Sequence, residues 1–340
     1  MPDKKEKEAL LTLKGLKTFF PVKGGFFGKT TGYVQAVNDI NLTIYKGETL
    51  GLVGESGCGK TTLGKTILQL YKPTEGEMIY EFEDGPRNLA ELKGKEMDMA
   101  RQKIQIVFQD PQSSLNPSFT IYQSLSDPLK KFGVKTKEER RKIIGDLLEA
   151  VNMRREYMDR YPHEFSGGQR QRIGIARALC INPELVICDE AVSALDVSIQ
   201  AQVLNLLKEL KEKHNLTYIF ITHDLSVVEY ISDRIAVMYL GRIVELADAD
   251  ELYRHTIHPY TQALLSAIPV ADIHYKKNRI VLQGDVPSPM NPPSGCHFHG
   301  RCNMCKERCK TEKPELKRYE IDGKEHYVAC HFAEEIIKKE

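Results

Sequence analysis

Long hydrophobic runs and a surplus of either charge are both missing from this sequence. No uninterrupted apolar stretch reaches the roughly 18 residues that a membrane-spanning helix requires. The first residues, MPDKKEKEA, are charged and lead into no apolar segment of the kind found in secretory leaders. We therefore expect a chain that is made and kept inside the cell. The formal net charge of +1 argues against a nucleic-acid binder that relies on a broad basic surface.

Internal repeats and low-complexity tracts are also lacking, and the sequence instead alternates between two textures. With 340 residues, 41% hydrophobic and 28% charged, it has the composition of a globular protein with one large or two small cores. Short β-like runs with Gly-rich turns occupy residues 11–110, and helical spacing follows over 121–180. Strand and helix patterns alternate again over 185–245, with a helix expected from about Ser198 to His214. This order predicts an α/β core with a helical insertion.

The strongest local signal is GESGCGKTT at residues 54–62, which follows the apolar TLGLVG and precedes the helical LGKTILQL. This is the strand, loop and helix setting that a phosphate-binding P-loop requires. Its glycines let backbone N–H groups turn toward the phosphates, Lys60 reaches the β- and γ-phosphates, and the Thr61 hydroxyl ligates magnesium. The residues expected to hold the nucleotide are Gly54, Glu55, Ser56, Gly57, Cys58, Gly59, Lys60, Thr61 and Thr62. A second GKTT at residues 28–31 lacks the first glycine and a leading strand, so we expect no nucleotide there.

Two acidic residues, Asp189 and Glu190, end the apolar run LVICDE. A carboxylate at the end of a buried strand can hold magnesium, and we assign this role to Asp189. The adjacent Glu190 is the candidate base for the attacking water. Two acids at this position can also mark a helix start, but the upstream P-loop favours the functional interpretation.

Four more short motifs follow in a fixed order: Gln109 in VFQDP, FSGGQ at 165–169, SALD at 193–196 and His223 in ITHD. Together with the P-loop and the acidic pair, they resemble the motifs of the ATPase subunit of an ABC transporter. Phe165 stands where that family usually has Leu, which is a conservative departure. The resemblance implies an α/β fold with a P-loop NTPase core, an N-terminal antiparallel β subdomain and a helical insertion subdomain at about residues 115–165.

The signature loop of the family matches Ser166, Gly167, Gly168 and Gln169. These small residues precede the helical stretch QRQRIGIARAL, so their N–H groups and the helix dipole can meet a phosphate. The resemblance places that phosphate in the opposite subunit. It therefore implies a dimer in which two ATP molecules are sandwiched between two subunits.

The remaining roles at the ATP site also come from the resemblance. Gln109 joins Thr61 and Asp189 as a magnesium ligand and acts with the catalytic residues. His223 is expected to hydrogen-bond the γ-phosphate and to hold Glu190 and the water in line. The adenine requires an aromatic platform from the N-terminal strands. Phe20 is our choice for that platform; the alternatives are Tyr33 or a packing role for either ring.

Longer stretches narrow the family further: SSLNP at 113–117, CDEAVSALDVSIQAQVLNLL at 188–207, HPYTQALLSAIP at 258–269 and PPSGC at 292–296. They resemble the ATPase subunits of dipeptide and oligopeptide importers. Such ATPases usually work in pairs, and Ala191, Val192 and the loop KGGFFGKTTGY resemble the second member. The implied partners are another ABC ATPase subunit (a different one in a heterodimer, or a second copy of this chain in isolation) and two membrane permeases, with the chain at the cytoplasmic face of the membrane. An extracellular peptide-binding protein is an indirect partner. Relatives carry nickel or sugars, so nickel or another small solute stays open as cargo.

The same resemblance implies an ATPase domain at residues 1–258 and a C-terminal extension at 259–340. The extension contains the proline-rich stretch 284–296, which predicts an extended linker into a small Cys-rich module. Three other classes fit less well. ABC ATPases of DNA repair carry large insertions in the core, and translation-factor ABC proteins carry two cassettes. A module that binds ATP without hydrolysis would not need Glu190 and His223.

Five of the eight cysteines lie in the last 45 residues. Because disulfides are disfavoured in a reducing compartment, we expect a metal centre. For zinc, only Cys302 and Cys305 have hairpin spacing, with His297, His299 and His331 as spare ligands. The importer resemblance instead implies a [4Fe–4S] cluster. Its ligands would be Cys296, Cys302, Cys309 and Cys330, and Cys305 would not be a ligand. The cluster would have a structural or regulatory role.

Overall fold

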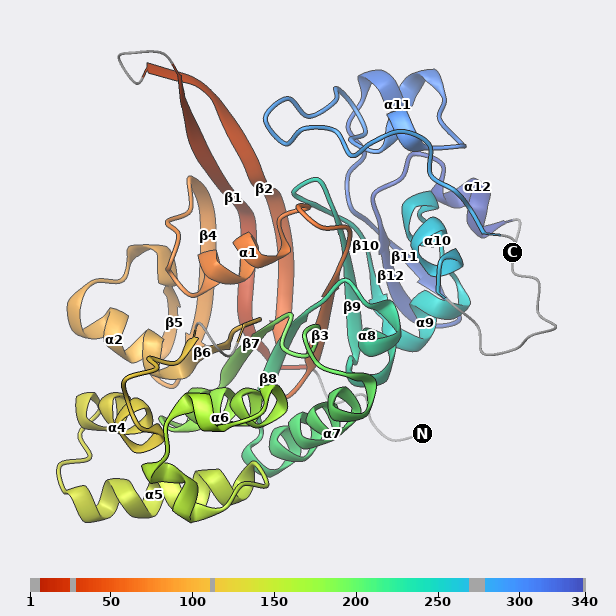
Figure 1. Cartoon of the computed structure of the whole chain (residues 1–340). Helices are drawn as coiled ribbons and strands as arrows, with labels where there is room; N and C mark the ends of the chain where they lie inside the picture. Colours follow the sequence, from red (N-terminus) through yellow and green to blue (C-terminus); the bar gives the residue numbers. More distant parts are fainter. Residues whose placement is uncertain (1–6, 25–28, 111–113, 269–278, 339–340) are drawn as a thin grey trace. The chain divides into compact units, whose positions relative to one another are not determined.

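The computed structural model in Figure 1 describes residues 7–24, 29–110, 114–268 and 279–338. They divide into two compact units, each described by itself below. The first consists of Met1–Tyr45, Thr49–Ala90 and Thr222–Glu340, and the second of Lys46–Glu48 and Glu91–Ile221. A short 3-10 helix, η1 (Leu89–Glu91), spans the point where the chain passes from the first unit to the second.

The first unit begins with an antiparallel sheet in the order β2-β1-β4-β5. Its strands are β1 (Ala9–Gly24), β2 (Lys29–Tyr45), β4 (Glu75–Phe82) and β5 (Gly85–Asn88). Figure 1 shows β1 and β2 as one long curved hairpin, whose register shifts at several bulges. Leu13 is buried between half-buried Thr12 and exposed Lys14, as expected of a strand with one face toward the core. The expected N-terminal antiparallel subdomain is confirmed. The second GKTT lies in β2 from Lys29 on, and its Gly28 is outside the described residues.

A second sheet of the first unit has the strand order β11-β12-β10-β9-β3. Only β3 and β9 in this set run parallel. The strands are β3 (Thr49–Val53), β9 (Arg234–Tyr239), β10 (Arg242–Asp248), β11 (Lys317–Ile321) and β12 (Lys324–Val328). The helices of this unit are α1 (Lys60–Ile67), α8 (Leu225–Ile231), α9 (Ala249–Arg254), α10 (Pro259–Ser266), η4 (His299–Arg301), α11 (Glu307–Thr311) and α12 (Ala333–Ile337).

The C-terminal extension continues this sheet. Its strand β12 pairs antiparallel with β10, with Glu245 opposite Val328 and Ala247 opposite His326. Phe298 of the extension is buried in one core cluster with Tyr239 and Tyr260. Residues 284–296 form no helix or strand, as expected of an extended segment. The pairing of β12 with β10 was not predicted from the sequence.

The second unit contains the parallel strands β8 (Thr217–Ile221), β7 (Leu185–Asp189) and β6 (Ile104–Val107), in that order. Every residue of β7 and β8 is buried, which is typical of parallel strands covered on both faces. The helices are α2 (Gly94–Lys103), α4 (Ile121–Lys131), α5 (Lys137–Ala150), α6 (Gly167–Leu179) and α7 (Val197–His214), with 3-10 turns η2 (Arg155–Asp159) and η3 (Pro162–Glu164).

These elements agree with the expected order of strands and helices. The helix predicted from about Ser198 to His214 is α7, which Asp196 caps by accepting the Ile199 N–H at 3.0 Å. The predicted helical insertion corresponds to α4, α5 and the turns η2 and η3. Within the ranges that the structure describes, no helix is both long enough and apolar enough to cross a bilayer.

Candidate ATP site and cysteine cluster

The P-loop joins β3 to α1 and keeps its shape through glycines. Gly54 and Gly59 have φ values of 150° and 108°, in the left-handed region. A Cβ at Gly54 would lie 2.1 Å from the Met238 carbonyl oxygen, and one at Gly59 would lie 2.0 Å from that of Ala36. No other residue type can therefore take these two positions without displacing backbone.

Lys60, the first residue of α1, lies along this loop. Its side chain is buried, and Nζ donates to the carbonyl oxygens of Gly54 at 2.7 Å and Glu55 at 3.0 Å. The Cys58 sulfur lies 3.8 Å from the same Nζ. Burial raises the pKa of the Cys58 thiol, and the nearby ammonium only partly opposes this effect. Cys58 is thus a small, neutral side chain inside the loop.

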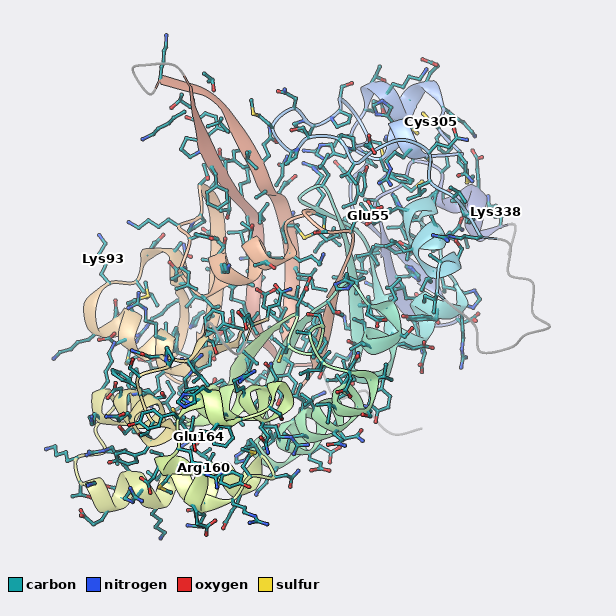
Figure 2. All side chains as sticks on the ribbon, viewed as in Figure 1. Glu55, Lys93, Arg160, Glu164, Cys305 and Lys338 are labelled. Atoms are coloured by element: carbon teal, nitrogen blue, oxygen red, sulfur yellow. The ribbon has the colours of Figure 1, made fainter. Side chains whose placement is uncertain are left out.

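Glu55, the second loop residue, is labelled in Figure 2. Two groups that the sequence did not reveal hold it in place. Its backbone N–H donates to the Tyr260 hydroxyl at 2.9 Å. Its carboxylate accepts two hydrogen bonds from the Arg301 guanidinium, at 2.7 and 3.0 Å. Both partners come from the C-terminal extension, and no local pattern links residues 246 positions apart.

In the second unit, the expected base and the expected Q-loop residue are in contact. Gln109 Nε2 donates to Glu190 Oε2 at 2.8 Å. Glu190 has a left-handed backbone, with φ of 47°, and its N–H donates to the Ile221 carbonyl at 2.9 Å. A non-glycine residue in this region is strained, and such strain is common at functional sites. Asp189, one residue earlier at the end of β7, is buried.

The signature loop forms the start of α6. Ser166 is the N-cap, and Gln169 completes a capping box by accepting the Ser166 N–H at 3.0 Å. A Cβ at Gly168 would lie 2.5 Å from Ile199 Cγ2, so a larger residue would require the Ile199 side chain to shift. The first N–H groups of a 13-residue helix are thereby presented at a small-residue turn, as the anion-binding role requires.

His223 and the aromatic candidates lie in the first unit. His223 is exposed between the end of β8 and the start of α8. Phe20 is half-buried and meets the Tyr71 ring edge to face, with ring centroids 5.1 Å apart. Tyr33 is 51% exposed. The choice of Phe20 as adenine platform stays a prediction.

Four cysteines of the extension share one environment. The Cys296 N–H donates to the Cys309 carbonyl at 2.8 Å, and Cys302 and Cys330 lie close enough to act on the Cys296 thiol. Burial raises the pKa of Cys296 to about 12 and that of Cys302 to about 11, and neighbouring thiols add to this, with Cys305 among those that act on Cys302. Cys305, labelled in Figure 2, is partly exposed beside Cys309 and donates to the Lys306 carbonyl.

Each histidine that could serve as an additional zinc ligand has one ring nitrogen close to a backbone carbonyl oxygen. His297 Nδ1 lies 3.3 Å from the Leu240 carbonyl, His299 Nδ1 lies 2.9 Å from that of Cys296, and His331 Nε2 lies 2.9 Å from that of Glu312. Across the residues described, no three or more His, Cys, Asp or Glu side chains are arranged to hold a metal ion. Each of these histidine contacts uses one ring nitrogen and leaves the other able to bind a metal, so they do not separate a four-thiol set from a mixed Cys and His set. The sulfurs of the described residues are not in metal-binding geometry.

The fold, the P-loop and the paired Gln109 and Glu190 define an ABC-type ATPase, and the comparisons agree. The ABC transporter family model matches residues 37–193. A dimeric ATP-binding cassette solved in a post-hydrolysis state with ADP and Pi aligns with a TM-score of 0.61 and 31% identity, covering 71% of this chain and 99% of that one. The protein cbiO1 from Clostridium perfringens, part of the ABC transporter complex cbiONQ, aligns with the same TM-score at 27% identity, covering 73% of this chain and 92% of that one.

The chain belongs to the family of oligopeptide and dipeptide ABC transport ATP-binding proteins. The model of the oligopeptide/dipeptide transporter C-terminal region matches residues 244–309. The oligopeptide transport ATP-binding protein AppF of Bacillus subtilis is 52% identical over 96% of this chain and 98% of its own length. The dipeptide transport ATP-binding protein DppF of Haemophilus influenzae is 46% identical over 96% and 97%. The expected family and enzyme class are confirmed.

Proposed function

We propose that the chain hydrolyses ATP to energise the import of dipeptides or oligopeptides through two membrane permease subunits. The observation that carries the proposal is the whole-length similarity to peptide-transport ATP-binding proteins, together with an intact P-loop and the contact between Gln109 and Glu190. The chain would act at the cytoplasmic face of the membrane. A solute-binding protein outside the cell would deliver the peptide to the permeases. Nickel or another small solute is the alternative cargo, and a role in DNA repair is the least supported.

The residues of the site take distinct roles in this proposal. The P-loop N–H groups and Lys60 bind the β- and γ-phosphates, and Phe20 packs against the adenine. Thr61, Gln109 and Asp189 would hold magnesium, which, when bound, would neutralise part of the phosphate charge. Glu190 accepts the proton of the attacking water, and His223 hydrogen-bonds the γ-phosphate.

We propose that the signature loop, Ser166 to Gln169, completes the ATP site of a second ATPase subunit. The start of α6 at Ser166 supports this role because the N-terminus of a helix presents N–H groups to which a phosphate can bind. The Ala191 and Val192 pair suggests that the natural partner is a related but different subunit.

Replacing the base tests the assignment. We expect Glu190→Gln to bind MgATP as tightly as the parent protein and to hydrolyse it at least about a hundredfold more slowly, the scale of losing a positioned base. Lys60→Ala should instead lose nucleotide affinity. Hydrolysis at the parental rate by Glu190→Gln, together with unchanged affinity in Lys60→Ala, would show that the site assignment is wrong. Peptide uptake by vesicles that contain the chain with its permeases, compared with nickel uptake, tests the cargo.

We also propose that Cys296, Cys302, Cys309 and Cys330 hold a [4Fe–4S] cluster. The mutual electrostatic effect of these four thiols, which indicates that they lie near one another, supports a four-thiol set. Such a cluster would have a structural role in the extension, because the residues assigned to the ATP site do not include these cysteines. Protein purified without oxygen should be brown and contain about four iron atoms per chain. Colourless protein that contains zinc would favour the zinc alternative.

A further inference from the structure

The C-terminal extension makes an unusually well-formed contact with the P-loop. The Arg301 guanidinium donates two hydrogen bonds to the two carboxylate oxygens of Glu55, at 2.7 and 3.0 Å. The Arg301 side chain is only 9% exposed and that of Glu55 27%. A bidentate pair of this kind is directional and charge-assisted, so it fixes the orientation of both partners better than a surface ion pair does.

A second contact holds the main chain of the same residue. The Tyr260 hydroxyl accepts the Glu55 N–H at 2.9 Å. Tyr260 is fully buried, and its ring packs against those of Tyr239 and Phe298, with centroids 4.7 and 5.4 Å away. The hydroxyl is therefore fixed in position by the core of the first unit. Glu55 is therefore held by hydrogen bonds at both its backbone and its side chain.

The contacts of Arg301 and Tyr260 with Glu55 affect the part of the loop that binds phosphate. The carbonyl of Glu55 and that of Gly54 are the acceptors of Lys60 Nζ. The far side of the loop is tied down separately, because the Gly241 N–H donates to the Cys58 carbonyl at 2.8 Å. A P-loop binds phosphate through N–H groups that already point inward, and a loop that must first be ordered binds more weakly.

We propose that Arg301 is a positioning residue for the nucleotide site. Arg301 and Tyr260, both in the C-terminal extension, hold the P-loop in the conformation that binds phosphate. The pair also neutralises the Glu55 carboxylate, which would otherwise repel the phosphates of an incoming nucleotide. Arg301 lies between Cys296 and Cys302, in the turn η4. The thiol-bearing segment and the nucleotide site are thus mechanically linked through one side chain.

The test compares nucleotide affinity in full-length variants. We expect Arg301→Ala to weaken MgADP binding, measured by calorimetry, and to raise the KM for ATP by about tenfold, the loss of one charge-assisted pair. The rate at saturating ATP should change less than twofold, because Arg301 touches no reacting group. Arg308→Ala is the matched control, since its ion pair with Glu312 in the same extension is more than half exposed on both sides. It should bind MgADP like the parent.

A double-mutant cycle separates positioning from general damage. Because the effect of Arg301 runs through Glu55, Arg301→Ala should weaken binding much less in a Glu55→Gln background than in the parent. Tyr260→Phe keeps the ring packing and loses only the hydroxyl, and we expect it to weaken binding about threefold, the loss of one neutral hydrogen bond. This variant carries the test if Arg301→Ala does not fold.

Two results would overturn the proposal. The first is parental MgADP affinity in both Arg301→Ala and Tyr260→Phe. The second is an equal loss from Arg301→Ala with and without Glu55→Gln, which would mean that the two residues act independently. If the parent protein itself failed to bind MgADP, the ATPase assignment would be at fault, and the three outcomes are distinguishable.

Discussion

Glu245 offers the most direct test of how the extension is joined to the rest of the first unit. Its side chain is fully buried, and three donors converge on it. Oε1 accepts the Ile257 N–H at 2.8 Å and lies 2.9 Å from His326 Nε2, while Oε2 accepts the His258 N–H at 3.2 Å. Glu245 on β10 thereby binds both the segment before α10 and strand β12.

Two substitutions should differ by the number of donors that they leave without an acceptor. Glu245→Gln can place its amide oxygen at the Oε1 position and keep Ile257 and His326, but its NH₂ group then faces the His258 N–H. The loss of one charged hydrogen bond and the orphaned N–H should cost about 2–3 kcal/mol of unfolding free energy. Glu245→Ala orphans all three donors and leaves a cavity, so about 4–5 kcal/mol is expected.

Urea denaturation and native-state hydrogen exchange measure this difference. The exchange of the Ile257, His258 and Val328 amides should accelerate in the order parent, Gln variant, Ala variant. Glu325→Gln, at an exposed position of the adjacent strand β12, should change the unfolding free energy by less than about 0.5 kcal/mol. Equal losses of unfolding free energy for Gln and Ala at position 245, or a loss no larger than that of the control, would show that the number of orphaned donors does not determine the effect.

Three further predictions concern pH, assembly and the cysteines. His258 caps α10 by accepting the Tyr260 N–H on Nδ1 at 3.1 Å, and burial lowers its pKa to about 4 from the usual 6.5. Between these pH values the unfolded chain binds more protons than the folded chain, so the unfolding free energy should fall as pH falls from about 6.5 to 4. Urea denaturation at several pH values should show that the unfolding free energy depends on pH less steeply in His258→Asn, which keeps a cap acceptor, by about 1.4 kcal/mol per pH unit. In sedimentation runs, Glu190→Gln protein should be monomeric without nucleotide and dimeric with MgATP, and a monomer under both conditions would favour pairing with a different subunit. Cys305→Ser should keep the metal content of the parent protein while Cys302→Ser loses it, and equal loss in both would place Cys305 among the ligands.

The ATP-site motifs could be read from the sequence because each of them is local. The P-loop is recognised from the short spacing of its glycines, Lys60 and Thr61, although the carbonyls that exclude a side chain at Gly54 and Gly59 belong to the distant residues Met238 and Ala36. Ser166 caps a helix that follows it directly. The alternation of buried strands and helices also predicted β7, α7 and β8. Letters alone are not sufficient, however, because Lys29, Thr30 and Thr31 of the second GKTT belong to a strand.

What the sequence could not show depends on partners far away in the chain. The contacts of Glu55 with Tyr260 and Arg301 cross 205 and 246 residues. Tyr260 stands in the stretch HPYTQALLSAIP, which indicates only the family, and no sequence motif points to Arg301. The left-handed backbone of Glu190 is set by a hydrogen bond to the neighbouring strand at Ile221, which no spacing rule predicts. Long-range pairing is decided by packing, which a window of sequence does not contain.

The boundary predicted at residue 258 can be tested in the same physical terms. A chain that ends there loses β12 from the edge of β10, and it loses Tyr260 and Phe298 from the cluster around Tyr239.

Tyr260, Phe298 and Val328 are almost fully buried. At about 1.5–3 kcal/mol for each large buried side chain, their removal costs roughly 5–9 kcal/mol, comparable to the whole net stability of a domain. It also exposes the donor row of β10 as a sheet edge open to aggregation. We therefore expect the 1–258 chain to be insoluble or without a cooperative urea transition, whereas a chain that ends at Ile337 should unfold like the full-length protein. A soluble 1–258 chain with cooperative unfolding and parental MgADP affinity would mean that the extension is a separable domain, and it would remove the basis for the role of Arg301 as well.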